Sequence, residues 1–118
     1  MRASWVFRQM ETRSLAEEVS HLHAEICSAL ADPTRITLIY ALAEQACTVG
    51  ELASRVGISQ PAASRHLKVL RDHGLVKPTR LGPQVEYSLT DRRLVEALDI
   101  LRAILRDRIA YRASIMES

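Results

Sequence analysis

The sequence predicts a mainly α-helical domain that carries one small β-hairpin. Three observations support this fold class. Apolar residues recur at steps of three and four over most of the 118 residues, which is the spacing of one helix face. One short segment, Val85 to Leu89, alternates instead between apolar and polar residues, as a half-buried strand does. Glycine and proline mark the places where these periodic segments stop.

Length and composition favour one globular domain. With 47% hydrophobic and 25% charged residues, the chain differs from disordered and membrane-spanning proteins. Its apolar runs are short and its first residues lack the core of a secretion signal, so we expect a cytoplasmic protein with no membrane partner. We assign residues 1–12 to an N-terminal arm and residues 13–118 to the domain. In the arm, Trp5 and Phe7 either anchor on a partner subunit or lie in a frayed tail.

Positive charge is concentrated in the middle of the chain. The formal net charge is only +2, yet the segment from Arg55 to Arg80 holds six basic residues and one acidic residue. A localised basic region on a nearly neutral protein is typical of a surface that binds a polyanion such as nucleic acid.

Two helices are expected before residue 46. The first carries an apolar stripe from Leu15 to Leu30 at helical spacing. Asp32 and Pro33 end it and begin the second, because proline suits the first turn of a helix. The second helix, over 33–45, is apolar nearly all the way round and is therefore predicted to be the most buried element.

A capping signal marks the start of a short third helix. Thr48 and Glu51 have the spacing of a capping box, in which each side chain accepts a hydrogen bond from the other residue's backbone N–H. This helix is expected to run from Val49 to Val56 and to stop at Gly57.

A fourth helix follows after a tight turn, with Ser59 as its cap and Gly74 as its left-handed stop. Its inward side chains are apolar, and its outward side chains are polar or basic. The inward set is Ala63, Leu67 and Leu70, and the outward set is Gln60, Ser64, Arg65 and Lys68. A short helix, a tight glycine-containing turn and a longer helix with a basic outer face predict a helix-turn-helix.

A β-hairpin over 75–89 is expected directly after the fourth helix. Its first strand is short and contains Pro78, the turn is Leu81-Gly82-Pro83-Gln84, and the second strand alternates. A hairpin in this position is a wing, so the fold class becomes a winged helix-turn-helix. Arg80 and Gln84 lie near the tip of the wing, where they can reach a neighbouring backbone or minor groove.

These elements predict double-stranded DNA as a partner, with helix 60–73 in the major groove. The candidate DNA contacts are Ser59, Gln60, Pro61, Ser64, Arg65, His66, Lys68, Lys77, Arg80 and Gln84. For His66 two interpretations stay open, a DNA contact or a wedge between the fourth helix and its neighbours.

The last helix, capped by Thr90-Asp91, carries a long apolar stripe that so small a monomer cannot cover. We therefore expect a homodimer through the first and last helices. The candidate interface residues are Leu15, Val19, Leu22, Leu94, Leu98, Leu101, Leu105 and Ile109.

Three segments in this order resemble the arsenical-resistance-repressor (ArsR/SmtB) family of bacterial winged-helix regulators. They are ALADPTRITLIYAL, TVGELASRVGISQPAASRHLKVLRDHGLV and the hairpin end VEYSLT, and the likeness covers roughly residues 26–90. The resemblance implies a homodimeric repressor on an inverted-repeat operator that overlaps its promoter, with release when an inducer binds.

The resemblance also implies where an inducer site would lie, and the known types are not recognisable here. The family's thiol site reads Thr48-Val49-Gly50-Glu51-Leu52 in this chain, and no histidine follows His73 for the zinc site. The sulfide-sensing pair would need a cysteine near Tyr40 and another in the last helix, which has none. The inducer is of another type, or there is none.

The two cysteines, Cys27 and Cys47, leave two interpretations open. The simpler one is a pair of small buried residues in a reducing compartment. The sharper one is a thiol sensor, either a redox pair or a site for a soft metal or an arsenical. His23 shares a helix face with Cys27, but two ligands are too few for a zinc site, so no metal site is assigned.

An enzyme is not expected, because the sequence has no phosphate-binding glycine loop, no Cys/His cluster and no carboxylate pair beside a basic group. The alternative function is a winged-helix module for protein–protein contact, since a fold does not fix its use. Arg65 and Lys68 on the exposed side of the fourth helix favour DNA.

Overall fold

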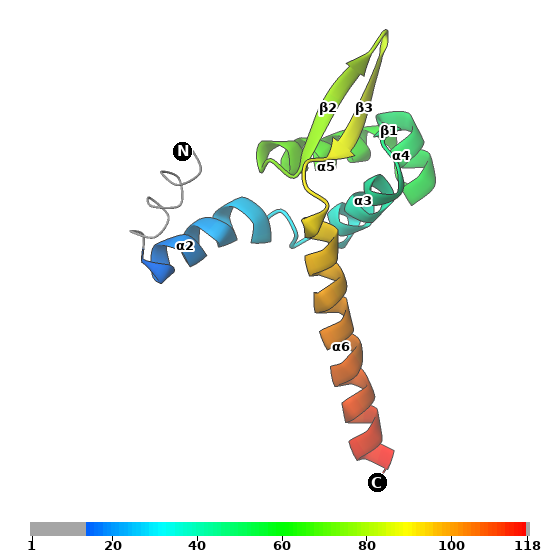
Figure 1. Ribbon diagram of the computed structural model, residues 1–118. Coiled ribbons are helices and arrows are strands. Elements are labelled where there is room, and N and C mark those ends of the chain that lie inside the picture. The colour runs from blue at the N-terminus through cyan, green and yellow to red at the C-terminus, as the bar shows by residue number, and fades with distance from the viewer. Residues whose placement is uncertain (1–13, 118) are drawn as a thin grey trace.

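The computed structural model of the protein describes residues 14–117 and has the predicted order of helices and hairpin (Figure 1). The predicted arm, with Trp5 and Phe7, lies outside the described residues. The elements are α2 (Leu15–Leu22), η1 (His23–Cys27), α3 (Pro33–Glu44), β1 (Cys47–Thr48), α4 (Val49–Val56), α5 (Gln60–Asp72), β2 (Val76–Leu81), β3 (Gln84–Leu89) and α6 (Arg93–Glu117).

The helices begin and end at the capping residues that the sequence indicates. Asp32 accepts hydrogen bonds from the backbone N–H groups of Thr34 and Arg35 at the start of α3. Thr48 and Glu51 form both hydrogen bonds of the capping box of α4. The backbone N–H of Ala62 donates to the Ser59 hydroxyl at 3.2 Å. These side chains satisfy backbone groups that a helix end leaves without partners.

The first helix differs from the prediction in its second half. The α-helix ends at Leu22 and continues as the π-helical segment η1 to Cys27, where the backbone N–H of Ser28 donates to the carbonyl of His23 at 3.0 Å. The chain then turns, and the Arg35 guanidinium fixes this turn by donating to the carbonyl of Ala29 at 2.6 Å. The change of helix type alters which residues of this segment share a face.

The wing is part of a three-stranded antiparallel sheet in the order β1-β3-β2. The sequence predicts only two of these strands. The third, β1, has two residues, in which Cys47 pairs with Tyr87 and Thr48 with Glu86. So short a strand has no hydrophobic period, and only its pairing with β3 defines it. This pairing joins the base of the wing to the start of α4.

The core lies beneath α5 and the base of the wing, and α3 runs through its centre. Three side chains of α3, Leu38, Ile39 and Leu42, are at most 3% exposed, which confirms the prediction that this helix is the most buried element. From the other elements, the core receives Ala29, Cys47, Leu52, Leu67, Leu70, Leu75, Val76 and Leu98.

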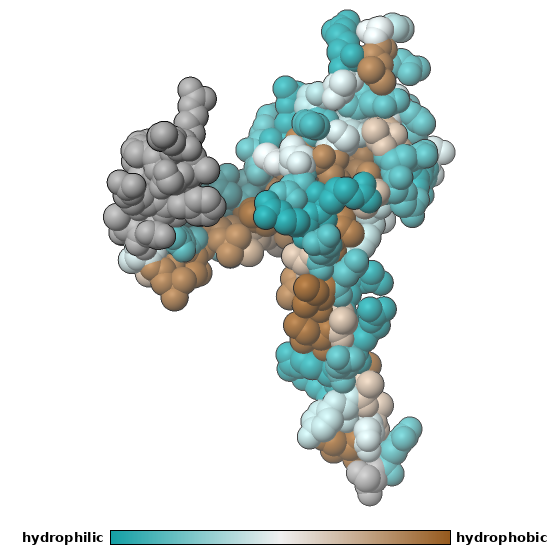
Figure 2. Space-filling view, viewed as in Figure 1, coloured by the Kyte–Doolittle hydropathy of each residue, from teal (hydrophilic) through white to brown (hydrophobic). Residues whose placement is uncertain are grey.

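The helices α2 and α6 project away from this core in different directions (Figure 1). Figure 2 shows hydrophobic side chains along both projecting helices. The exposed apolar residues of α2 are Leu15, Val19 and Leu22, and those of α6 include Ile100, Leu101, Ile104, Leu105 and Ile109. Within residues 14–117 no helix combines the length and the apolar character that a membrane span requires.

Two predicted interface residues, Leu94 and Leu98, lie at or in the core of the protomer. Leu98 is 5% exposed and packs in the core of its own protomer, and Leu94 is half-buried against that core. The first turns of α6 are held against α3, so these two leucines contribute to folding of the protomer. The assignment of Leu98 to an interface between protomers is therefore wrong, whereas that of the half-buried Leu94 stays a prediction. The dimer prediction rests on the apolar residues farther along α6 and on those of α2.

Candidate nucleic-acid interface

The helix α5 presents a polar face because its opposite face is anchored in the core. Ala63, Leu67 and Leu70 are at most 1% exposed, so the rotation of the helix is fixed by burial. The four outward side chains that the sequence predicts, Gln60, Ser64, Arg65 and Lys68, are all exposed. The predicted division of this helix into an inner and an outer face is confirmed.

After α5 the chain makes a left-handed turn at Gly74 and continues into β2 of the wing. Gly74 has φ +73°, a conformation that favours glycine, and the backbone N–H of Leu75 donates to the carbonyl of Leu70 at 2.9 Å. The Thr90 hydroxyl donates to the carbonyl of Gly74 at 2.7 Å, so the end of the wing is tied to the end of α5. These contacts give the wing a fixed position beside the helix.

The two basic residues near the middle of α5 differ in their pairing. The Arg65 side chain forms no hydrogen bond or ion pair with any other residue in 14–117. Lys68 Nζ lies 3.0 Å from Asp72 Oδ2, and both side chains are exposed. A solvent-exposed pair of this kind contributes little to stability and can be exchanged for another anion. Of these two residues, Arg65 is therefore the more available for a base edge.

His66 turns away from this face. It is half-buried, and it lies near the Asp32 carboxylate at the start of α3. The pKa of Asp32 is lowered overall, although desolvation by burial raises it. The backbone N–H groups of Arg35 and Thr34 lower this pKa by hydrogen bonding, and the nearby positive charges of His66 and Arg35 lower it further. Of the two interpretations of His66, the structure favours the wedge between α5 and α3. Its assignment as a DNA contact stays a prediction.

The predicted wing contacts are not all on one face. Arg80, which pairs with Val85, and Pro78, which pairs with Tyr87, lie on the same face of the wing as the buried Val76. Lys77 lies between Val76 and Pro78 and therefore points to the opposite face. The structure does not bring Lys77 together with Arg80. Gln84 is exposed beside the turn at the tip of the wing.

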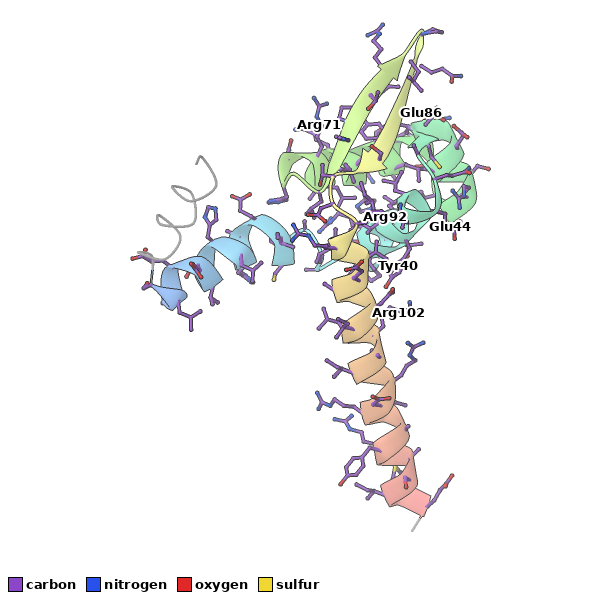
Figure 3. All side chains as sticks on the ribbon, in the orientation of Figure 1. Tyr40, Glu44, Arg71, Glu86, Arg92 and Arg102 are labelled. Carbon is purple, nitrogen blue, oxygen red and sulfur yellow. The ribbon has the colours of Figure 1, made fainter. Side chains whose placement is uncertain are left out.

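A groove between α5 and the wing contains a basic residue that the sequence reasoning missed. Its volume is about 380 Å³, and its lining residues are Val49, Arg71, Pro78, Arg80, Val85 and Tyr87. Arg71 lies on α5 next to the base of the hairpin (Figure 3). The sequence signal that could have identified Arg71 is its spacing from Gln60. Eleven residues make three turns of helix, which puts both side chains on one side of α5.

The two thiols lie in different environments. Cys27 is exposed, whereas Cys47 is fully buried, and both are free. The expectation that both are buried is therefore wrong for Cys27. The Arg55 guanidinium lies 3.3 Å from Cys47 Sγ and also contacts Glu44, and these partners raise the pKa of Arg55.

A metal site is not formed by the described residues either. Between residues 14 and 117 no three side chains among His, Cys, Asp and Glu are grouped so that they could hold a metal ion.

Comparison with known proteins decides the family. Residues 32–77, from the start of α3 to the first residues of the wing, match the model of the bacterial regulatory proteins of the arsR family. A transcriptional repressor SmtB homolog of Synechocystis sp. is 40% identical over 75% of this chain and 67% of the relative. The biofilm growth-associated repressor of Xylella fastidiosa is 34% identical over 79% of this chain and 82% of the relative.

This chain belongs to the arsR family. It is therefore a DNA-binding transcriptional regulator with a winged helix-turn-helix, and not an enzyme.

Solved structures share this architecture. The Mycobacterium tuberculosis protein Rv0081 is 34% identical and superposes with a TM-score of 0.72 over 80% of this chain and 96% of that one. A homodimeric winged helix-turn-helix domain of Mycobacterium bovis superposes with a TM-score of 0.72 over 85% of this chain and 94% of that one, at 21% identity, so that it shows the fold alone. The arsR-family resemblance inferred from the sequence is confirmed.

Proposed function

We propose that this arsR-family regulator represses transcription by binding, as a homodimer, to an inverted-repeat operator. In each half-site α5 lies in the major groove and the β2–β3 hairpin lies beside it as the wing. The observation that carries the proposal is the exposed polar face of α5, with an unpaired Arg65, held outward by the fully buried Ala63 and Leu70. An α-helix fits the width of the major groove, and arginine binds guanine in a bidentate manner.

The outward side chains have distinct roles in this proposal. Arg65, Gln60 and Ser64 contact base edges, because they are exposed and carry the donors and acceptors that base readout needs. Lys68 exchanges Asp72 for a backbone phosphate, which is a contact of position and not of sequence. Ser59 and Pro61 lie at the start of α5, close to the same DNA strand. The Ser59 hydroxyl already accepts a hydrogen bond as the cap of this helix.

The dimer is supported by apolar surface that one protomer leaves uncovered. On α2, Leu15 is 75% exposed, and on α6, Leu101 and Leu105 are 60% and 58% exposed. Exposed apolar stripes of this kind mark an interface, and in a second copy the same two helices offer matching surfaces. A twofold dimer would place the two α5 helices about 34 Å apart, one turn of B-form DNA.

We also propose that an inducer releases the operator, and that the protein acts in the cytoplasm, where its DNA is. The inducer is unidentified. The exposed Cys27 is the thiol available to an oxidant or a soft metal, because Cys47 is in the core.

Selection from a pool of random-sequence duplexes with the full chain tests the proposed function. We expect an enriched inverted repeat whose half-sites are one helical turn apart. With that duplex, Arg65→Ala should weaken binding by about 1 to 3 kcal/mol and relax the preference at one base pair of each half-site. The matched control is Arg106→Ala, because Arg106 is an exposed arginine on α6. No enrichment of any sequence would favour the alternative, a module for protein–protein contact.

A further inference from the structure

The groove between α5 and the wing has the chemistry of a site for a sugar-phosphate chain. Two of its lining residues, Arg71 and Arg80, are basic, and the other four are apolar or aromatic. The lining contains no carboxylate. Guanidinium groups bind phosphate oxygens in a bidentate manner, and apolar side chains pack against the deoxyribose rings that carry no charge.

The strand register explains why the charge of the wing on this side is positive. Arg80 pairs with Val85, and both lie on the face that overhangs α5. The acidic residue of the wing, Glu86, pairs with Thr79 and therefore lies on the opposite face. The pleat of the hairpin thus separates Arg80 from the one carboxylate between residues 76 and 89.

The helix contributes its own side of the groove along one edge. Gln60 Nε2 lies so close to α4 that a Cβ on Gly50 would come within 3.1 Å of it. Arg71 follows Gln60 by three turns and is on the same side of α5. The edge of the helix that carries both residues therefore faces the start of α4 and the wing, and Val49 of α4 completes the lining.

We propose that this groove holds one sugar-phosphate strand of the operator, clamped between Arg71 of the helix and Arg80 of the wing. This inference rests on the proposed function. A helix in the major groove and a wing that reaches the neighbouring minor groove lie on two sides of the strand that separates the grooves. The strand must therefore pass between them. Arg71 positions the protein on DNA, and it reads no base.

Paired substitutions that each remove one charge test the clamp. The variants are Arg71→Gln, Arg80→Gln and the double variant, and the matched control is Arg106→Gln, because Arg106 is an exposed arginine on α6, away from the groove. Arg71→Gln and Arg80→Gln should each lower the slope of log affinity against log salt by about one, and the double variant by about two. The affinity of the wild type falls as the salt concentration is raised from about 50 to about 200 mM. Each lost phosphate contact should make that fall about threefold smaller.

The loss should also be independent of sequence. Arg71→Gln should weaken binding to the selected operator and to a scrambled duplex by the same factor, whereas Arg106→Gln should leave both affinities and the slope near those of the wild type. An unequal loss on the two duplexes would make Arg71 a base contact and overturn the clamp.

Neutral methylphosphonate linkages, placed one at a time along the operator, locate the strand. A methylphosphonate at one or two adjacent positions between the major-groove and minor-groove footprints should weaken DNA binding by the wild-type protein and by the Arg106→Gln variant. The same positions should have no further effect on the Arg71→Gln/Arg80→Gln variant. If that variant keeps the wild-type sensitivity, the clamp is wrong even though operator binding stands. If the wild-type protein selects no operator, the proposed function itself fails.

Discussion

The Tyr40 hydroxyl donates a hydrogen bond to Asp99 Oδ1 at 2.7 Å and so joins α3 of the core to the projecting helix α6. Arg102 completes the contact (Figure 3). Its guanidinium carbon lies 5.2 Å from the centre of the Tyr40 ring, and its Nη1 lies 3.7 Å from Asp99 Oδ1. Tyr40 and Asp99 together raise the pKa of Arg102. This cluster sets the direction in which α6 leaves the core, and hence the orientation of the proposed dimer surface relative to α5.

The Tyr40–Asp99 contact predicts a modest loss of stability in Tyr40→Phe. The ring remains over Arg102, but the hydrogen bond to a carboxylate is lost, which should cost about 1 kcal/mol of unfolding free energy. Urea denaturation at a fixed protein concentration measures the loss, because the stability of a dimer depends on concentration. Tyr111→Phe is the control, since Tyr111 is 67% exposed on α6. An equal effect of both variants would show that the hydrogen bond contributes nothing.

Leu101→Glu should break the proposed dimer without unfolding the protomer. Leu101 is 60% exposed in one protomer, so a carboxylate there is solvated until a second copy covers it. Two unpaired carboxylates buried across a twofold axis should weaken association roughly a hundredfold or more. Analytical ultracentrifugation over a range of concentrations measures this change, and circular dichroism checks the fold. The control is Ala110→Glu, which adds the same charge on the other side of α6 and should stay dimeric. If both variants are monomeric, the face that carries Leu101 is not specifically the dimer interface.

The Asp91–Arg93 pair predicts a pH-dependent contribution to stability. Hydrogen bonds from the Arg93 side chain and backbone lower the pKa of Asp91 from 3.8 to about 2. Because the folded pKa is below the unfolded one, the stabilisation is fully present above about pH 4 and is lost as the pH falls toward about 2. Asp91→Asn should therefore lower the melting temperature at neutral pH, and the gap from the wild type should close below about pH 4. A gap that does not change with pH would assign the effect to packing.

The thiols predict selective reactivity. In the native protein, Ellman's reagent should modify the exposed Cys27 rapidly and the buried Cys47 only after unfolding by guanidinium. If Cys27 is the sensor, an oxidant or arsenite should release the operator from the wild type and not from Cys27→Ser. Release that persists in Cys27→Ser would exclude it as the sensor, and rapid native modification of Cys47 would contradict its place in the core.

Much of the fold could be predicted because it depends on residues that are close in sequence. The capping box of Thr48 and Glu51, the cap at Ser59 and the stop at Gly74 are local interactions over two to four residues. The outer face of α5 could be predicted for the same reason, since helical spacing alone separates Arg65 from Leu67 and Leu70.

Other features escaped the sequence because they join distant segments. The strand β1 exists only by pairing with β3. The burial of Leu98 depends on the packing of α6 against α3, two helices that are also joined by the Tyr40–Asp99 contact, whose partners are 59 residues apart. The different environments of Cys27 and Cys47 follow from the π-helical segment and from the packing of the core around β1.

By itself, the sequence determined the order of the elements, the helix-turn-helix with its wing and the basic outer face, because spacing and capping act over a few residues. Only the tertiary structure decided that Arg71 and Arg80 line one groove while Lys77 points elsewhere, and that Leu98 belongs to the core. The physical reason is that the register of β2 against β3 and the packing of α6 on α3 depend on contacts that no local pattern encodes.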